Sequence, residues 1–116
     1  MIHEDNREIW KIRAVKPYVE AHNHCLVGRV LCRDDASVTL KCRSFHFGRL
    51  VNGVKDVSVG MLEVRIIPWV RIEIVNVLSS SFSYHNAKLS LCENGGVVLS
   101  DGSDSCVLAP PRPEAY

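Results

Sequence analysis

The sequence lacks most features that would assign a function directly. It has no C-x-x-C pair, no Gly-rich phosphate loop and no internal repeat, and no apolar run approaches the ~20 residues of a membrane-spanning helix. The N-terminus has no apolar segment of the kind found in signal peptides. The formal net charge of +1 favours no class of partner. We therefore expect a cytoplasmic protein with no membrane partner and no cofactor.

Catalytic and metal-binding patterns are also missing. His46 and His85 have no Ser, Cys or carboxylate partner at a recognisable spacing. His22, His24 and Cys25 resemble a metal cluster, but adjacent strand residues face opposite ways and no fourth ligand lies near. A turn with a flanking His is the preferred interpretation. We predict neither an enzyme nor a metal site.

The cysteines do not suggest a disulfide framework. There are five, an odd number, at positions 25, 32, 42, 92 and 106. Three of them, Cys25, Cys32 and Cys42, lie at strand positions in or next to the expected core. We interpret them as small buried hydrophobic residues in a reducing compartment.

Length and charge distribution are more informative. The chain has 116 residues, 47% of them hydrophobic, which predicts one domain with an appendage. Residues 10–75 carry eleven Lys and Arg against six Asp and Glu, whereas residues 1–9 and 76–116 each have a net charge of −2. A basic middle permits nucleic-acid binding, although an ordinary solvated surface explains it equally well.

The clearest local pattern is a hairpin around residues 34–36. Apolar and polar residues alternate on both sides of this acidic turn, as in strands with one buried face. A three-residue turn would pair Val30 with Leu40 and Cys32 with Val38, so that both apolar rows lie on the same side.

A second hairpin is expected to follow, with its strands over 38–50 and 57–67. The apolar phase flips midway in both strands, and a bend shared by Ser44 and Gly60 explains both flips. Gly53 is expected in the left-handed conformation in a loop over 51–53. The expected pairs are Phe47 with Val57, Phe45 with Val59, Leu62 with Cys42, Val64 with Leu40, and Ile66 with Val38. Such bends curl a small sheet into a barrel.

The flanking segments complete the predicted fold. Asp5 and Glu8 form a capping-box pattern that predicts a helix over 6–14, although the alternation of residues 10, 12 and 14 leaves a strand as the alternative. A short strand is expected over 18–21. Pro68 and Trp69 mark a tight corner before a fifth strand that begins at Val70. A Trp at such a corner is more often a core plug than a platform for a ligand.

The C-terminal part has a different composition. A Ser-rich linker follows Leu78, Asn94-Gly95-Gly96 predicts a hairpin over 88–100, and a Pro-rich tail ends the chain. We therefore divide the chain into a barrel with an N-terminal helix (1–78) and a C-terminal extension (79–116).

The layout over residues 5–77 resembles the Sm-like (LSm/Hfq-like) family. In the first Sm motif an apolar-Gly-x-apolar stretch precedes an Asp six residues after the Gly, which matches Gly28 and Asp34. The apolar pair after the turn matches Val38 and Leu40, and the corner matches residues 67–69. The chain departs from the family at the Asn after that Asp, at the Arg-Gly pair of the second motif and at the Lys-His of Hfq-like members.

This resemblance implies a mainly β fold, a short N-terminal helix followed by a five-stranded, strongly bent antiparallel SH3-like barrel. It also implies a homo-oligomeric ring joined through the fourth and fifth strands, whose apolar run over 62–77 would supply the open edge. The turn and the corner would face the pore and bind single-stranded RNA, with Trp69 or Tyr18 stacking on a base and Arg71 or Arg33 contacting phosphate. The candidate RNA-binding residues are Asp34, Ser37, Trp69, Arg71, Arg33 and Tyr18.

Two functions therefore remain open. The first is a ring that binds U- or A-rich RNA, and the second is a ring or barrel that serves assembly alone. Basic side chains gathered on one face would favour RNA, and basic side chains paired with Asp34, Glu63 and Glu73 would favour assembly. The acidic extension could also cover a basic face and compete with RNA.

Overall fold

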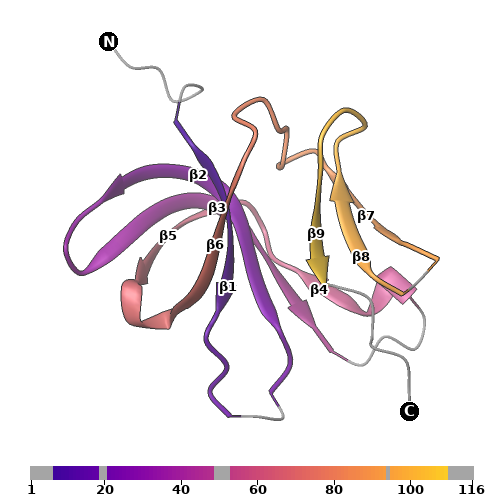
Figure 1. The fold of residues 1–116 in the computed structure, drawn as a ribbon, viewed down its shortest axis with the longest axis horizontal. Coiled ribbons are helices and arrows are strands. Elements are labelled where there is room, and N and C mark those ends of the chain that lie inside the picture. Colours follow the sequence, from indigo (N-terminus) through magenta and orange to yellow (C-terminus); the bar gives the residue numbers. More distant parts are fainter. Residues whose placement is uncertain (1–6, 19–20, 49–52, 94, 110–116) are drawn as a thin grey trace.

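The computed structural model describes residues 7–18, 21–48, 53–93 and 95–109, which fold mainly into antiparallel β-strands arranged as two sheets (Figure 1). The first sheet contains β1 (Ile9–Ala14), β2 (His24–Arg33), β3 (Ser37–Phe47), β4 (Val57–Val59), β5 (Glu63–Pro68) and β6 (Ile72–Leu78). The second contains β7 (Lys88–Leu91), β8 (Val97–Ser100) and β9 (Ser105–Ala109). The 3-10 turns are η2 (Gly53–Asp56) and η3 (Trp69–Arg71). No helical segment in the described ranges is long and apolar enough to cross a membrane.

The first sheet is strongly bent but open. Its strand order is β4-β3-β2-β1-β6, and β5 also pairs with β3. The chain passes from β5 through η3 to β6, yet these two strands pair with β3 and β1 and, among the described strands, not with each other. The described sheet therefore does not close into the predicted five-stranded barrel. The outer edges of β5 and β6 are left unpaired within the described chain.

The predicted N-terminal helix is wrong over residues 9–14, which form strand β1 instead. Ile9 packs into one hydrophobic cluster, and Trp10 and Ile12 pack into another on the opposite face. This period-two burial is the alternative that the sequence left open. Residues 9–14 form a strand because β1 lies between β2 and β6 and hydrogen-bonds to both. This pairing outweighs the local capping-box pattern.

The hairpin around residues 34–36 is confirmed. Val30 lies opposite Leu40 as predicted, but a bulge after Val30 moves Cys32 opposite Thr39 instead of Val38. Because of this shift Cys32 is exposed, whereas Cys25 and Cys42 are buried. The interpretation of Cys32 as a core residue is therefore wrong.

The second hairpin is correct up to its bend and shifted beyond it. Phe45 pairs with Val59 and Phe47 with Val57, as predicted. Beyond Ser44 the register slips by one residue, so that Ile67, not Ile66, lies opposite Val38.

The cause of the slip is one extra residue in the bend. Four steps lead from Val59 to Glu63, while only three lead from Phe45 to Cys42. A slip of one residue turns a strand over. Val64 and Ile66 therefore point outward and are 58% and 70% exposed, while Ile67 is buried.

The remaining local predictions have mixed outcomes. Gly53 has a φ of 77°, the left-handed conformation expected for it. Tyr18 lies in a bend and Ala21 in irregular chain, so the predicted strand over 18–21 is wrong where it is described. Residues 19–20, 49–52, 94 and the Pro-rich tail over 110–116 lie outside the described residues.

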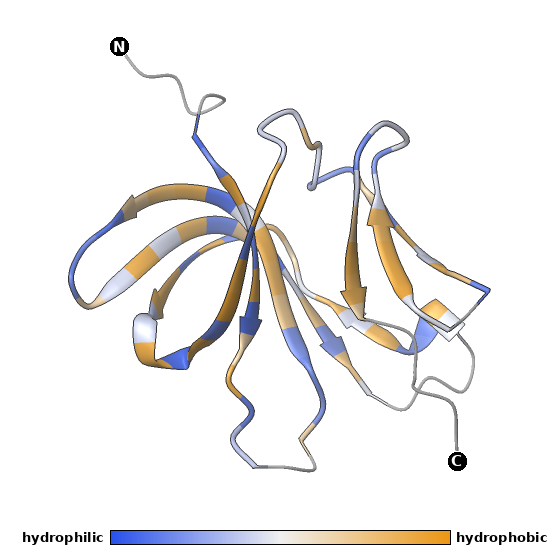
Figure 2. Cartoon of the chain, viewed as in Figure 1, coloured by the Kyte–Doolittle hydropathy of each residue, from blue (hydrophilic) through white to orange (hydrophobic). Residues whose placement is uncertain are grey.

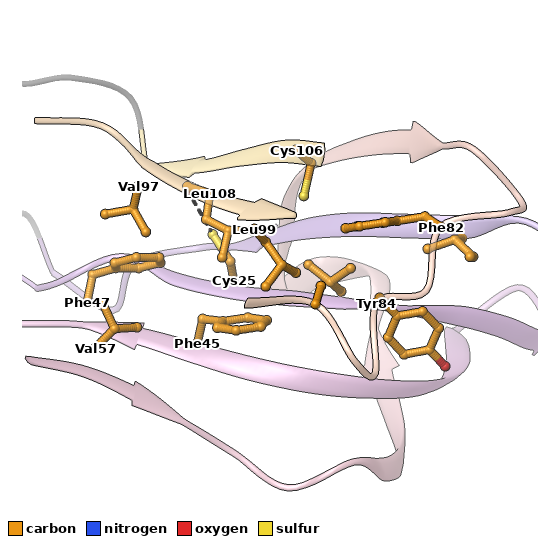
Figure 3. Packing of buried hydrophobic residues seen from close by; sticks show 13 residues of the cluster. Cys25, Phe45, Phe47, Val57, Phe82, Tyr84, Val97, Leu99, Cys106 and Leu108 are labelled. Carbon is orange, nitrogen blue, oxygen red and sulfur yellow. Dashed lines mark hydrogen bonds between the residues drawn. The ribbon is translucent and has the colours of Figure 1, made fainter. Parts of the chain in front are cut away.

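The C-terminal segment packs as a second layer on the first sheet. The predicted hairpin over 88–100 is present as β7 and β8, and β9 adds a third strand. Phe45 and Phe47 of β3 pack with Leu99 and Leu108 of the second sheet in one buried cluster (Figure 3). Apolar and polar residues alternate along many of the strands that build these layers (Figure 2). The two sheets therefore share a core.

The opposite face of the first sheet encloses a separate core. It consists of Trp10, Ile12, Leu26, Val38, Leu40, Cys42 and Ile67. Trp69 packs against the margin of this second cluster.

Candidate functional site

The turn between β2 and β3 is built by Asp34. Its Oδ1 accepts hydrogen bonds from the backbone N–H groups of Ala36 at 2.8 Å and Ser37 at 2.9 Å. These bonds hold the pKa of the exposed Asp34 carboxyl below its usual range. An Asp that bonds the backbone two and three residues ahead is a turn-forming residue.

The turn and the corner lie together, as the family resemblance implied. The backbone N–H of Trp69 donates to the Ala36 carbonyl at 3.0 Å, and its indole N–H donates to the Asp34 carbonyl at 2.8 Å. The Trp69 ring lies 6.2 Å from the Trp10 ring, and the Arg33 guanidinium lies 5.6 Å from the centre of that Trp10 ring. Asp34, Ser37, Trp69 and Arg33 therefore form one constellation, which we call the turn face.

Most recognition groups of the turn face are already engaged. Asp34 uses Oδ1 in its own turn, and the Trp69 N–H is bonded to the main chain. Trp69 is half-buried against the second core cluster. Only the exposed guanidinium of Arg33 is left to contact a phosphate group.

Two of the predicted residues lie elsewhere. Tyr18 lines an open hollow together with Arg13 and Glu73, whose side chains form an ion pair at 3.0 Å. Arg71 follows Trp69 in η3 but lines a different pocket. The six candidate residues therefore do not form a single RNA site within one chain.

The pocket lined by Arg71 is the second candidate site, which we call the histidine pocket. It has a volume of about 330 Å³ and lies where β1 ends, β2 begins and β3 ends. Its walls are formed by Ala14, Val15, Pro17 and Ala21 together with nitrogen-bearing side chains. The nitrogen-bearing residues are Lys16, His22, His24, His46 and Arg71.

His24 and His46 face each other across β2 and β3. Their rings are stacked with centroids 3.7 Å apart and planes 18° apart. Burial, followed by the nearby charges of His46, Arg65 and Arg71, lowers the pKa of His24 to about 4. His24 is therefore neutral at pH 7. Its Nε2 atom is buried and has no hydrogen-bond partner among the described residues.

Other basic side chains hold the C-terminal segment in place. Arg43 donates to the carbonyls of Tyr84 at 2.8 Å and Ala87 at 2.9 Å, and Lys11 donates to the Val107 carbonyl. Arg29 donates to the Ser80 carbonyl at 3.4 Å. Part of the basic character of the middle segment therefore serves packing of the second sheet, and two further residues, Arg13 and Arg65, form ion pairs with Glu73 and Glu63.

Comparisons with protein-family models, with curated proteins and with solved structures found no match for this chain. The site must therefore be judged from its own geometry. Sequence reasoning missed the histidine pocket, although a signal was present. The correct pairing of Val30 with Leu40, extended along the hairpin, places His24 opposite His46.

Proposed function

We propose that this chain is an assembly module whose copies join edge to edge, β5 of one copy pairing with β6 of the next. The observation that carries this proposal is the register of β5, which exposes Val64 and Ile66 on a strand whose outer edge pairs with no other described strand. An exposed apolar edge strand is a template for pairing with another chain.

The exposed edge of β6 matches that of β5 in length and in apolar character. β6 has seven residues against six in β5, and it exposes Ile74 and Val77. Val70, between the two strands, is also exposed. Glu63 is paired with Arg65 at 3.0 Å and Glu73 with Arg13, so neither edge presents an unbalanced charge. Pairing unlike edges of identical chains is a head-to-tail contact, which produces a ring when the rotation closes.

The test is the mass of the protein in solution. We expect the wild-type chain to sediment as an oligomer at tens of micromolar and Ile66→Glu to sediment as a monomer. Val107→Glu is the matched control, because Val107 is 47% exposed on β9 of the other sheet. A wild-type monomer, or equal dissociation by both variants, would contradict the proposal.

Single-stranded RNA at the turn face is a second candidate function. It is favoured by the exposed Arg33 guanidinium above the Trp10 ring, next to Trp69. In a ring, the turn faces of several copies would gather around the pore. Repeated Arg and aromatic groups bind single-stranded nucleic acid without sequence preference.

Fluorescence anisotropy with labelled oligo-U and oligo-A at two salt concentrations tests this candidate. Trp69→Ala is unsuitable because Trp69 also anchors the turn. Arg33→Gln should weaken binding and reduce its salt dependence, whereas Lys55→Gln, an exposed cation in η2, should not. Absence of binding at low salt, or equal weakening by both variants, would leave assembly as the function.

A further inference from the structure

We infer that the histidine pocket binds a nucleotide, with the base stacked on His46 and the phosphate held by Arg71 and Lys16. This site is separate from the turn face and does not depend on assembly. The ligand class is a flat heteroaromatic ring that carries a phosphate, either free or within single-stranded RNA.

The size and walls of the pocket suit such a ligand. Its volume of about 330 Å³ lies at the lower end of the range of roughly 300–1,000 Å³ that is usual for small-molecule sites. Ala14, Val15, Pro17 and Ala21 provide apolar walls, and the polar groups come from the same two segments and from β2, β3 and η3. A few directed polar groups in an apolar hollow are typical of binding pockets.

The stacked imidazoles provide the platform. The His46 ring lies against His24 on one side, and its side chain is exposed to solvent. Bases stack on aromatic and His side chains in single-strand recognition. Because the low pKa of His24 keeps that ring neutral, the pair presents aromatic surface at pH 7 without the repulsion of two adjacent charges.

The positive charge of the pocket favours a ligand that carries a phosphate group as well as a base. Arg71 and Lys16 are exposed, and neither forms an ion pair with a described carboxylate. None of the described residues that line the pocket is acidic. The nearby Glu63 and Glu73 are paired with Arg65 and Arg13. A phosphate is the natural partner of an uncompensated guanidinium and ammonium.

A polar atom in the wall also lacks a partner. Nε2 of His24 is buried and unpaired among the described residues, although His24 lines the pocket. Leaving a buried polar atom unpaired is costly. A ligand that brings a polar group to this wall would satisfy it.

Calorimetric titration with UMP, AMP, uridine and inorganic phosphate tests the inference directly. We expect both nucleotides to bind more tightly than either uridine or phosphate alone. His46→Ala should weaken nucleotide binding at least about fivefold, and His46→Phe, which keeps a ring, should restore it. Arg71→Gln should weaken nucleotides and leave uridine unchanged. Arg33→Gln is the control, because it lies on the turn face and should have no effect.

A second readout follows His24 by NMR. A bound phosphate would offset the positive fields of His46, Arg65 and Arg71, so the pKa of His24 should rise when nucleotide is added. An unchanged His24 titration at a nucleotide concentration that saturates the calorimetric signal would place binding elsewhere and overturn the inference. No calorimetric binding at millimolar nucleotide would overturn it as well.

Short oligo-U and oligo-A then identify the source of the nucleotide. Tighter binding of RNA than of UMP or AMP, weakened by the same two variants, would identify a nucleotide of a single strand. Tighter binding of the mononucleotide would identify a small metabolite. Repeating the titrations with Ile66→Glu separates this inference from assembly, since the pocket should bind equally well in a dissociated chain.

Discussion

The indole N–H of Trp69 donates a hydrogen bond to the main-chain carbonyl of Asp34, 35 residues earlier in the sequence, at 2.8 Å. This bond joins the 3-10 turn η3, between β5 and β6, to the turn between β2 and β3. It gives Trp69 a structural role of the kind that its corner position favours, whereas base stacking by Trp69 is implied only by the family resemblance.

Trp69→Phe should therefore destabilise the protein. The variant keeps an aromatic ring against Trp10 but leaves the Asp34 carbonyl without its indole donor, which costs about 1 kcal/mol. Urea denaturation followed by circular dichroism would measure this loss. Tyr18→Phe, an exposed aromatic outside the turn face, is the control and should change nothing; stability equal to wild type in Trp69→Phe would show that the bond contributes nothing.

The bend between β4 and β5 allows a test in which one substitution should destabilise the protein and a second should restore its stability. A Cβ added to Gly60 would overlap the Ser44 hydroxyl, and the Ser44 Cβ would lie at an acceptable 3.5 Å. Gly60→Ala should cost roughly 1–3 kcal/mol through overpacking.

Combining Gly60→Ala with Ser44→Ala should recover most of that stability, because the second change removes the overlapping oxygen. Thermal unfolding of the single and double variants would measure the coupling. Purely additive losses would mean that the overlap with Ser44 does not set the cost.

His24 makes stability depend on pH over a defined range. Its pKa in the folded protein is about 4 and its ordinary pKa is 6.5, so the unfolded chain takes up the proton first as the pH falls. Stability should therefore be unaffected by His24 above pH 6.5 and should decrease between pH 6.5 and 4. Because the side chain is partly exposed, we expect a loss on the order of 1 kcal/mol.

His24→Phe keeps a ring against His46 and removes the titrating group, so it should flatten this part of the pH profile. Urea midpoints measured from pH 4 to 8 provide the test. Losses below pH 4 belong to Asp34 and Asp101, whose pKa values are lowered by backbone hydrogen bonds, and they should persist in the variant. An unaltered slope between pH 4 and 6.5 would show that another group causes it.

The second sheet should unfold together with the first. Leu99 is fully buried where the sheets meet, and Leu99→Ala should cost about 2–5 kcal/mol. Its exposed neighbour on β9, Val107, should tolerate Ala with little change. A single transition, detected equally by hydrogen exchange in β3 and in β8, is expected; separate transitions would show that the extension is an independent unit.

These results also show how far the sequence predicts the fold. Alternation and turn chemistry located the hairpin at 34–36, the pairing of Phe45 with Val59 and the hairpin at 88–100, because those features depend on neighbouring residues. The strand at Ile9–Ala14 depends on pairing with Ile72–Leu78, which no local pattern reveals.

The candidate site was predicted only in part for the same reason. The family resemblance implied that Asp34 and Trp69 lie close together, and the hydrogen bond between them shows that they do. Arg71 turns away from them because its side chain lines the histidine pocket, and sequence spacing does not report side-chain direction. His24 and His46 are distant in sequence and meet only through the register of β2 and β3.

The extra residue in the bend before β5 has a wider consequence. The extra residue leaves the amino acids at positions 63–67 unchanged, but it decides which of them face outward. With it, Val64 and Ile66 face outward; without it, Arg65 and Ile67 would do so. A deletion of Met61 alone would turn the strand over and exchange an apolar outer surface for a partly charged one. If copies assemble edge to edge as proposed, the length of one short connection would decide whether the chain forms oligomers or remains a monomer.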